Sequence, residues 1–337
     1  MTLLGEIIRE EIVAHGPMTF ARFMELALYH PQHGYYGSGQ AQIGRGGDFF
    51  TNVSVGAIFG KLLAAYFIEW WQKLGRPDEF TVLEQGAHDG QFAHDVLSAL
   101  ARSQCFESIR YLIVEPFPIW RERQQQKLAT FSGKCFWAES IQEVEPFIGI
   151  HFSNELFDAL PVHLLDGEGG ECLVSFDGGR FHLDKYASRE ESTDAPKLMR
   201  EIAGKLSRGV ILVIDYGYTR EQLAARTETS LRVRARHRVL ASPFAEIGQA
   251  DISAHVNWTA LIEAAQSAGA QLIGLEDQHH FITGILRELV PAADVQHFSA
   301  SDKRGLQTLL HPEMLGRSFH ALALGKNFSS PLAGFGP

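Results

Sequence analysis

The stretch Phe80–Leu100, "FTVLEQGAHDGQFAHDVLSAL", decides the fold of this chain. It opens with an apolar run typical of a buried strand, turns at Gly86 and Gly90, and continues as a helix. A glycine turn in this position lets the backbone approach a ligand closely and directs the N–H groups of the helix start toward it. The stretch therefore predicts a strand–turn–helix unit that binds a nucleotide-like ligand.

Apolar strands and helices alternate along the rest of the chain. Continuous apolar strands separated by helices indicate a parallel sheet that is covered on both faces. We therefore expect an α/β fold with a doubly wound, mostly parallel, Rossmann-like sheet. The predicted strands lie within residues 80–86, 109–117, 134–140, 147–161 and 209–218, and two further candidates, 270–282 and 318–326, can pair antiparallel.

Three additions to this domain are predicted. Residues 1–78 contain three apolar helical patterns and form a helical N-terminal cap, whereas residues 79–325 form the α/β domain. Within that domain, residues 162–186 carry two Gly-rich turns between alternating runs and predict an inserted β-meander. Residues 326–337 are expected to form a loose tail.

Composition excludes several classes of protein. The chain has 337 residues, of which 45% are apolar and 21% charged, as is ordinary for a soluble globular protein. Its net charge of -10 argues against a nonspecific nucleic-acid binder, because neutralising phosphates needs a basic surface. Cys105, Cys135 and Cys172 form no Cys-x-x-Cys pair and are expected to be reduced intracellular thiols.

No targeting, membrane or metal signal is found in the sequence. The start, "MTLLGEIIREEIVAHG", resembles neither a signal peptide nor an Arg-rich transit peptide. The apolar run 55–71 is interrupted by Lys61 and Glu69 and is shorter than the ~20 residues of a spanning helix. The 15 histidines show no H-E-x-x-H or two-His-one-carboxylate spacing. We expect a cytoplasmic protein without a membrane segment, metal or nucleic-acid partner.

The glycine turn favours one cofactor class over another. A dinucleotide-binding turn has the pattern G-x-G-x-x-G, but His88 and Gln91 occupy its second and third glycine positions. A methyltransferase turn has the pattern E-x-G-x-G-x-G, which Glu84, Gly86 and Gly90 fit and only His88 breaks. Glu115, at the end of the next strand, is well placed to accept hydrogen bonds from both ribose hydroxyls of an adenosyl cofactor.

Polar residues follow four of the predicted strands. In a doubly wound sheet, ligands bind at the carboxyl ends of the strands. Polar strand ends are also common where a chain simply meets solvent, so each one alone is a weak signal. The four ends together, with a glycine turn among them, predict a binding edge formed by Glu84, Glu115, Asn154–Glu155 and Asp215.

These residues belong to blocks that resemble the MidA family of S-adenosylmethionine-dependent methyltransferases. That family includes the mitochondrial complex I assembly factor that methylates a protein arginine. The resemblance covers nearly the whole chain, and its blocks are "LYHPQHGYYG", "GRGGDFFT", "LEQGAHDGQFAHDVL", "VEPFPIWRERQQQKL", "SNELFDALPV", "VIDYGY" and "GQADISAHVNWTAL". It implies a class I methyltransferase fold, with S-adenosylmethionine as cofactor and a protein or peptide as substrate.

The resemblance also implies roles for individual residues. The segment 46–51, "GGDFFT", would fold over the cofactor from the cap, with Gly47, Asp48 and Thr51 at its methionine end. The residues beneath the cofactor would be Glu84, Gly86, His88 and Gly90. Glu115 would bind the ribose, and Asn154 would be the last of the cofactor-binding residues. An ordinary turn with a buried Phe49 and Phe50 is the alternative for "GGDFFT".

The catalytic candidates are Glu155, Asp158, Asp215 and His255. A guanidinium has a pKa above ~12, so a methyl-accepting arginine needs carboxylates to orient it and receive its charge. Glu155 and Asp158 have that chemistry, and a helical turn between them would put both on one side. Structural roles are the alternatives. Asp158 could cap a helix, and Tyr216 beside Asp215 could be a core residue. His255 could be a structural histidine rather than a proton relay.

Departures from the family pattern keep two other functions open. His88 stands where the family usually has a glycine, and Gln85 stands where it usually has an apolar residue. The segment "TNVS" replaces the family's usual Thr-Ser-Pro. A non-glycine residue holds this turn only if its φ is negative or mildly left-handed, which histidine tolerates. The leading prediction is N-methylation of a protein or peptide arginine. Methylation of a small molecule or of another peptide atom, and a noncatalytic cofactor-binding assembly chaperone, remain the alternatives.

Overall fold

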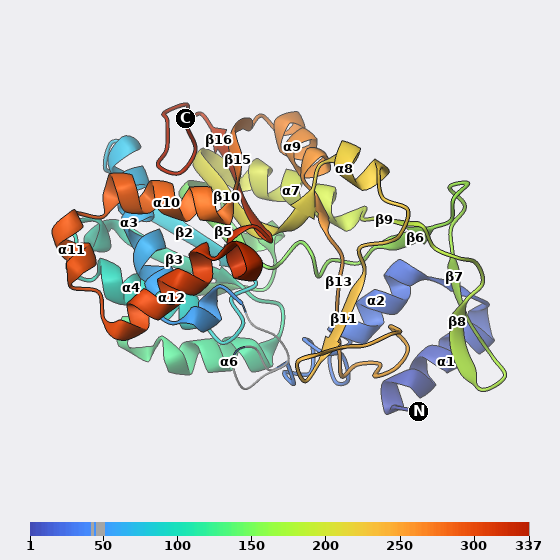
Figure 1. Cartoon of the computed structure of the whole chain (residues 1–337). Helices are drawn as coiled ribbons and strands as arrows, with labels where there is room; N and C mark the ends of the chain where they lie inside the picture. The colour runs from blue at the N-terminus through green and yellow to red at the C-terminus, as the bar shows by residue number, and fades with distance from the viewer. Residues whose placement is uncertain (42–43, 45–50, 337) are drawn as a thin grey trace. The chain divides into compact units, whose positions relative to one another are not determined.

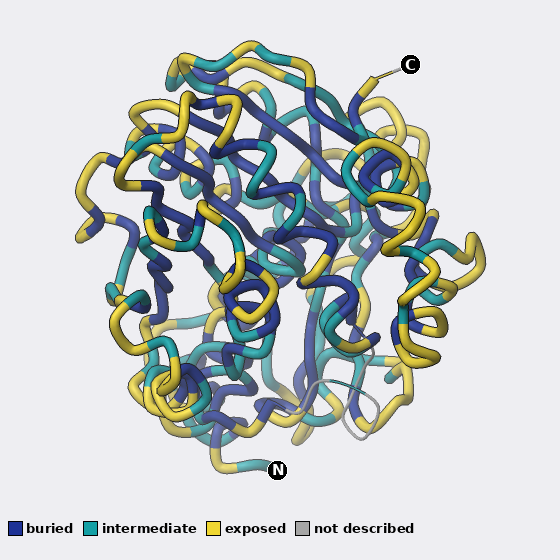
Figure 2. The backbone as a smooth tube through the Cα atoms, turned by 90° about the vertical axis from the view of Figure 1, so that its left-hand side faces the viewer, coloured by how far each residue is buried: buried dark blue, intermediate teal, exposed yellow. Residues whose placement is uncertain are grey.

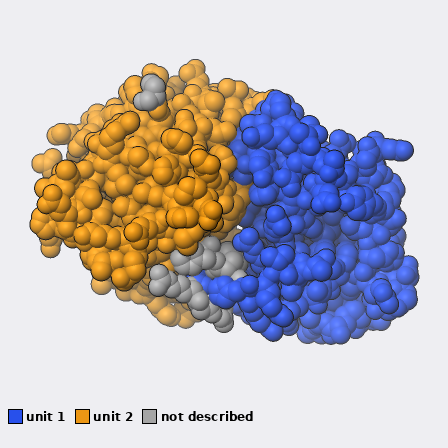
Figure 3. Space-filling model, viewed as in Figure 1, with its two compact units in different colours: residues 1–50, 157–197, 217–260 blue, residues 51–156, 198–216, 261–337 orange. Residues whose placement is uncertain are grey.

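The computed structural model describes residues 1–41, 44 and 51–336, and the chain divides into two compact units (Figure 3). Unit 1 comprises residues 1–50, 157–197 and 217–260, and unit 2 comprises residues 51–156, 198–216 and 261–337. This division differs from the predicted boundary at residue 78. The helix α3 (Ile58–Lys73) belongs with the sheet, because its apolar face packs against α4 (Gln91–Leu100) and β5 (Phe147–Asn154).

The main sheet has the strand order β15-β16-β10-β5-β2-β3-β4. Strands β4, β3, β2, β5 and β10 are parallel, whereas β16 is antiparallel to both β10 and β15. The doubly wound, mostly parallel fold predicted from the sequence is therefore confirmed, including the antiparallel pairing of the last two strands. The bounds not given above are β2 Phe80–Gln85, β3 Ile109–Val114, β4 Cys135–Ala138, β10 Leu206–Tyr218, β15 Gln271–Asp277 and β16 Phe319–Lys326.

Helices cover the sheet of unit 2 and supply its aromatic core. The helices α3, α4, α10 (Gln278–Leu289) and α12 (Ala300–Leu310) gather beside the strands, and α3 contacts each of the other three (Figure 1). The ring of Phe92 lies 4.3 Å from that of Phe152 and 5.6 Å from that of Phe59. Buried residues concentrate in the strands and on the inner sides of the helices (Figure 2). The other helices are α5 Cys105–Ser108, α6 Pro118–Lys127, α7 Asp194–Lys205, α9 Trp258–Ser267 and α11 Ala292–Gln296.

Two glycines bring the central strands close together. Gly149 in β5 has a φ of +152°, and a Cβ atom there would lie 1.9 Å from the carbonyl oxygen of Thr81 in β2. Gly209 in β10 has a φ of +142°, and its Cβ would lie 1.9 Å from the carbonyl oxygen of Gly149. Only glycine fits both positions, so these residues help fix the register of β2, β5 and β10.

Unit 1 combines helices with small sheets. The helices α1 (Leu3–His15) and α2 (Phe20–Tyr29) correspond to two of the three helical patterns predicted within residues 1–78, and Phe23 of α2 packs edge-on against Phe244 at 5.0 Å. The predicted meander, residues 162–186, is instead divided between two sheets, because β6 pairs with β9, which lies beyond residue 186, while the β7–β8 hairpin pairs with β1. The strands are β1 Met18–Thr19, β6 His163–Leu165, β7 Leu173–Asp177, β8 Arg180–Leu183 and β9 Arg189–Glu191.

The last segment of unit 1, residues 217–260, contains a third small sheet. Strand β11 (Arg232–Ala235) lies between β12 (Arg238–Val239) and β13 (Asp251–Ser253), and both pairings are antiparallel. The short helix α8 (Arg220–Ala224) precedes this sheet, and β14 (Val256–Asn257) pairs with the end of β10. Across the described ranges of both units, no helix is long and apolar enough to cross a membrane.

The C-terminal segment packs more tightly than predicted. Leu332, Ala333 and Phe335 are buried, and the ring of Phe335 lies 5.2 Å from that of Phe281 in α10. The residues after β16 are therefore anchored on unit 2 by apolar contacts rather than loose, although their Ser, Pro and Gly content is typical of a flexible end.

Candidate active site

The strand register of unit 2 aligns the predicted binding edge. Gln85 of β2 pairs with Val114 of β3 and with Ser153 of β5, and Asn154 pairs with Ile214 of β10. Gly86, Glu115, Glu155 and Asp215 each come one or two residues after these pairs. Because these four strands are parallel, their carboxyl ends meet at one edge of the sheet. The structure thus brings together the strand-end residues that the sequence predicted there.

The glycine turn adopts a left-handed backbone at alternate positions. The φ angles are +78° at Gly86, +46° at His88 and +81° at Gly90. His88 therefore adopts the mildly left-handed conformation, one of the two that the sequence analysis allowed. A Cβ on Gly86 would lie 3.4 Å from Leu156, and one on Gly90 would lie 3.4 Å from Gln124. Glycine is the N-cap of α4, so no side chain at that position occupies the helix start.

Glu84 is buried beneath the turn rather than open at the edge. Its side chain is 3% exposed, and the hydroxyl of Tyr111 donates a 2.7 Å hydrogen bond to it. Burial raises the pKa of Glu84 to about 8, although the Tyr111 hydrogen bond acts in the opposite direction. A carboxyl group with this pKa is largely protonated at neutral pH and supports the turn from below.

The unusual Gln85 has a buried partner. A 3.1 Å hydrogen bond joins its Oε1 atom to Nε2 of His151, which lies in the neighbouring strand and is fully buried. Burial lowers the pKa of His151 to about 3, so its imidazole stays neutral. Gln85 therefore satisfies the Nε2 atom of this core histidine, which an apolar residue at that position would leave without this hydrogen bond.

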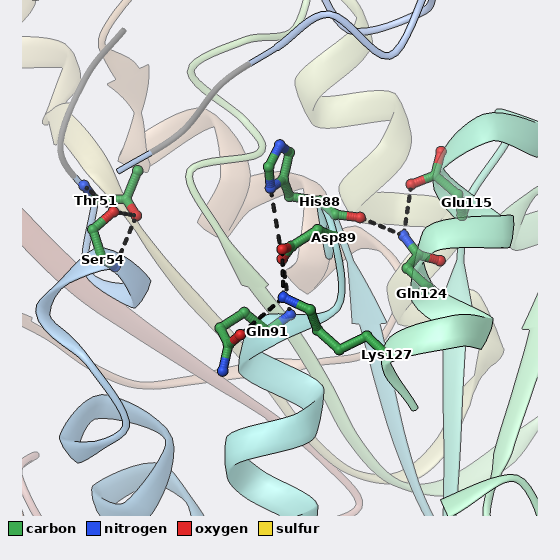
Figure 4. A network of polar contacts seen from close by, with 8 residues as sticks. All are labelled: Thr51, Ser54, His88, Asp89, Gln91, Glu115, Gln124 and Lys127. Atoms are coloured by element: carbon green, nitrogen blue, oxygen red, sulfur yellow. Dashed lines mark hydrogen bonds and ion pairs between the residues drawn. The ribbon is translucent and has the colours of Figure 1, made fainter. Parts of the chain in front are cut away.

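Glu115 is held by a hydrogen-bond network from α6 (Figure 4). Its Oε1 atom accepts from the backbone N–H of Phe117 at 3.0 Å, and its Oε2 atom accepts from Nε2 of Gln124 at 3.1 Å. The same Gln124 nitrogen donates to the carbonyl oxygen of His88 at 2.7 Å, and Trp137 donates to the Gln124 carbonyl at 3.0 Å. Burial raises the pKa of Glu115 to about 7 against these hydrogen bonds. Gln124 thus ties the ribose candidate to the glycine turn.

A second connection joins the turn to α6. Lys127 forms an ion pair with Asp89 at 2.5 Å and donates to the side-chain oxygen of Gln91 at 2.9 Å (Figure 4). Burial pushes the pKa of Asp89 upward, but His88 and Lys127 outweigh it and hold that pKa well below its ordinary value. Asp89 is therefore an ionised structural residue, and its Oδ1 atom accepts from the backbone N–H of Gln91 at 3.1 Å.

The other candidate cofactor residues of unit 2 lie in local hydrogen-bond chains. The Thr51 hydroxyl is buried and bonds to the Ser54 hydroxyl at 2.9 Å (Figure 4). Nδ2 of Asn52 donates to Oδ1 of Asn154 at 2.9 Å, and Nδ2 of Asn154 donates to Oε1 of Glu155 at 2.9 Å. Glu155 is thereby oriented by the Asn154 amide, which Asn52 holds in turn. Gly47 and Asp48, the other predicted residues of the covering segment, lie outside the described residues.

Asp215 stabilises the backbone at the same edge. It is fully buried, and its two carboxylate oxygens accept from the N–H groups of Tyr216 at 2.8 Å and Leu156 at 3.2 Å. The N–H of Glu155 donates to the carbonyl oxygen of Ile214 at 3.0 Å. These contacts fix the chain where β5 ends, so Asp215 positions the segment that carries Glu155.

Asp158 and His255 belong to unit 1. Asp158 is 7% exposed, and its backbone carbonyl accepts from the N–H of Ala254 at 2.9 Å. Burial raises the pKa of Tyr29, and the charge of Asp158 raises it further. The backbone N–H of His255 donates to the Ser230 hydroxyl at 2.8 Å. The helical turn expected between Glu155 and Asp158 is wrong, because Glu155 has a left-handed φ of +53° and the next residues form bends and turns.

Sequence reasoning missed Gln124 and Asn52. Trp120, Gln124 and Leu128 are buried at four-residue spacing, so Gln124 occupies a core position of an otherwise polar helix, and that spacing is a signal the sequence contained. Asn52 is fully buried, and its Oδ1 atom has no hydrogen-bond partner among the described residues. The sequence gives no comparable signal for Asn52, because its burial depends on β5.

The residues of unit 2 fit an adenosyl cofactor. Gly86 and Gly90 leave the backbone open at the start of α4, as close approach to a ligand requires. Each Glu115 carboxylate oxygen has two lone pairs, so the two hydrogen bonds it accepts leave capacity for ribose hydroxyls. No group of three or more His, Cys, Asp or Glu side chains in the described part of the chain is arranged to hold a metal ion.

The sheet order, the left-handed glycine turn and the acid after β3 define a class I S-adenosylmethionine-dependent methyltransferase. A family model described as "Putative S-adenosyl-L-methionine-dependent methyltransferase" matches residues 62–276. Because that match covers more than half of the chain, the protein belongs to this family. The resemblance predicted from the sequence blocks is confirmed, and S-adenosylmethionine is the cofactor.

Curated relatives and solved structures agree with this assignment. The Drosophila melanogaster "Protein arginine methyltransferase NDUFAF7 homolog, mitochondrial" is 27% identical, over 95% of this chain and 84% of that protein. The human protein arginine methyltransferase NDUFAF7 is also 27% identical, over 93% and 81%. A Burkholderia thailandensis crystal structure described as a "likely methyl transferase" bound to S-adenosyl-homocysteine has a TM-score of 0.87 and 29% identity, over 98% of this chain and 94% of that one.

Proposed function

We propose that this methyltransferase N-methylates an arginine of a protein or peptide. The observation that carries the proposal is that relatives aligned along more than nine tenths of the chain are named protein arginine methyltransferases. The position of Glu155 at the binding edge, oriented by Asn154 and by the Asp215-held backbone, supports it. The cytoplasmic location stays a prediction.

The chain's own residues have to orient the acceptor and receive its proton. S-adenosylmethionine supplies an electrophilic methyl group on a positively charged sulfur. A guanidinium is protonated at neutral pH, so its nitrogen becomes nucleophilic only as a proton leaves. In this proposal the Glu155 carboxylate pairs with the guanidinium and accepts the proton that leaves its nitrogen as the methyl group is transferred from the sulfur, while Asn154 holds the carboxylate in place. Glu115 takes the ribose, and Asp158 is a second candidate for pairing with the acceptor.

Label transfer tests this proposal directly. The purified protein is incubated with a cell lysate and S-adenosylmethionine labelled in its methyl group, and labelled peptides are analysed for methylarginine. Glu155→Gln is expected to abolish transfer while changing cofactor affinity by less than about threefold, or about 0.6 kcal/mol. Glu107→Gln, at an exposed position of α5, is the matched control and should transfer label like the wild type.

Each other outcome identifies a different error. Label found only in small molecules would contradict the protein acceptor and favour the alternative substrate class. Label on another protein atom would contradict the arginine assignment. Loss of cofactor binding in Glu155→Gln would place that residue in the cofactor site rather than beside the acceptor.

A further inference from the structure

Unit 1 contains a concentrated positive segment in an acidic protein. Residues 217–240 hold six arginines and two glutamates and neither aspartate nor lysine, a net charge of +4, whereas the whole chain has a net charge of -10. A surface that is charged only for solubility would follow the sign of the whole chain. The segment therefore calls for an explanation beyond solubility.

The fold displays two of these arginines on one side of a strand. Val233 and Ala235 of β11 are buried, so Arg232 and Arg234 point to the opposite face, because side chains alternate along a strand. The turn into β12 consists of Arg236 and His237, which both have a left-handed φ, at +51° and +59°. Such two-residue turns normally take Asn-Gly, so this hairpin keeps charged side chains where the backbone favours glycine.

A cavity of about 510 Å³ lies beside these arginines within unit 1. Its charged lining consists of Lys185, Arg226, Arg232 and Glu228, and apolar side chains including Phe244 complete its wall. Lys185 is balanced by Asp166 at 3.2 Å. Arg226 stacks over the ring of Tyr218 at 5.2 Å, and within the described chain neither Arg226 nor Arg232 forms an ion pair. The cavity thus offers two guanidinium groups without anionic partners beside the apolar side chains of its wall.

We propose that this cavity binds an acidic polypeptide segment, in which carboxylates flank an apolar side chain. The two guanidinium groups match carboxylates by paired hydrogen bonds, and the apolar wall matches a side chain between them. Glu228 in the wall and the negative charge of the whole chain disfavour a nucleic acid, whose binding needs a broadly basic surface. The inference rests on the proposed function in one respect: the acidic polypeptide that binds here is taken to be part of the protein that accepts the methyl group.

Fluorescence anisotropy with the full chain tests the proposal. The probe is a fluorescein-labelled peptide in which Asp and Glu flank a single Leu, compared with the same peptide carrying Asn and Gln. We expect the acidic peptide to bind more tightly, and its affinity to fall as salt is added. The double variant Arg226→Glu/Arg232→Glu should weaken this binding at least about tenfold, and Arg226→Gln/Arg232→Gln should weaken it less. Arg200→Glu, exposed on α7 in unit 2, is the matched control and should stay within about twofold of the wild type.

Several results separate the proposal from its rivals. A peptide with Lys in place of its acids should bind the Glu variant better than it binds the wild type. Equal binding of the acidic and neutral peptides, no effect of charge reversal, or tighter binding of a thymidine oligonucleotide would overturn the proposal. Thermal unfolding and S-adenosylmethionine titration of each variant show that it is folded. Anisotropy measures peptide binding and needs no methyl transfer. A wrong arginine assignment would therefore appear in the label-transfer experiment, whereas a wrong peptide site would appear in the anisotropy.

Discussion

Replacing Glu84 by glutamine is expected to flatten the pH dependence of stability. Glu84 is 3% exposed, and burial raises its pKa from the ordinary value to about 8. At pH values between the ordinary and the raised pKa, Glu84 holds a proton in the folded protein that it has released in the unfolded chain. The free energy of unfolding therefore falls as pH rises through this window, and the loss is complete above the folded pKa.

The size of the effect follows from the pKa. One pKa unit corresponds to about 1.4 kcal/mol, and linkage with a folded pKa of about 8 gives a loss near 2 kcal/mol between about pH 6 and pH 8. Glutamine does not titrate, and its carbonyl oxygen can still accept the Tyr111 hydroxyl. The wild type should therefore lose about 2 kcal/mol more than Glu84→Gln over this range.

Urea unfolding followed by tryptophan fluorescence measures this difference. Four of the five tryptophans, Trp70, Trp71, Trp120 and Trp137, lie in unit 2, so the signal reports mainly on the unit that contains Glu84. Glu107→Gln removes an exposed carboxylate instead and should parallel the wild type. If Glu84→Gln showed the same pH dependence as the wild type, Glu84 would be ionised in the folded protein and the burial argument would be wrong.

Three further predictions concern the network around the turn. Since the pKa of Glu115 is about 7, its ionised fraction should rise from about a tenth to about nine tenths between pH 6 and pH 8. S-adenosylmethionine affinity in calorimetry should rise severalfold over this range, and a pH-independent affinity would contradict the ribose role. Gln124→Ala leaves the Trp137 N–H and the His88 carbonyl without their partner, so urea unfolding should show a loss of about 2–3 kcal/mol; a loss under about 0.5 kcal/mol would refute the network. His88→Gly should change cofactor affinity less than about threefold, because the backbone carbonyl makes the Gln124 contact, whereas a tenfold loss would mean that the imidazole binds the cofactor.

The sequence predicted the fold well where the signal is local. The apolar runs of β2, β3, β5 and β10 are continuous because those strands are buried on both faces, so periodicity and length sufficed. The helices α1 and α2 were likewise predicted from local apolar patterns. The division into units was not, because unit 1 combines three segments that are far apart in sequence. The buried C-terminal residues depend likewise on α10, which no local pattern indicates.

The candidate cofactor residues could be predicted from the sequence more readily than the residues that hold them in place. The spacing of Glu84, Gly86 and Gly90 and the strand end at Glu115 predicted a cofactor-binding edge, and the strand register brings these strand ends to one edge of the sheet. The burial of Glu84 against Tyr111 and the bridging role of Gln124 arise from side chains on different elements, so spacing could not show them. The expected helical turn after Glu155 failed because that residue adopts a left-handed φ, which its residue type does not signal.

Calorimetric titration of S-adenosylmethionine into the wild type and Glu115→Ala tests most directly whether the sheet edge of unit 2 holds the cofactor. Glu107→Ala, at an exposed position of the same unit, is the control. The wild type and the control should bind alike, and Glu115→Ala should bind at least about tenfold more weakly, or about 1.4 kcal/mol. Absence of binding by the wild type, or equal binding by Glu115→Ala, would contradict the site described for this protein.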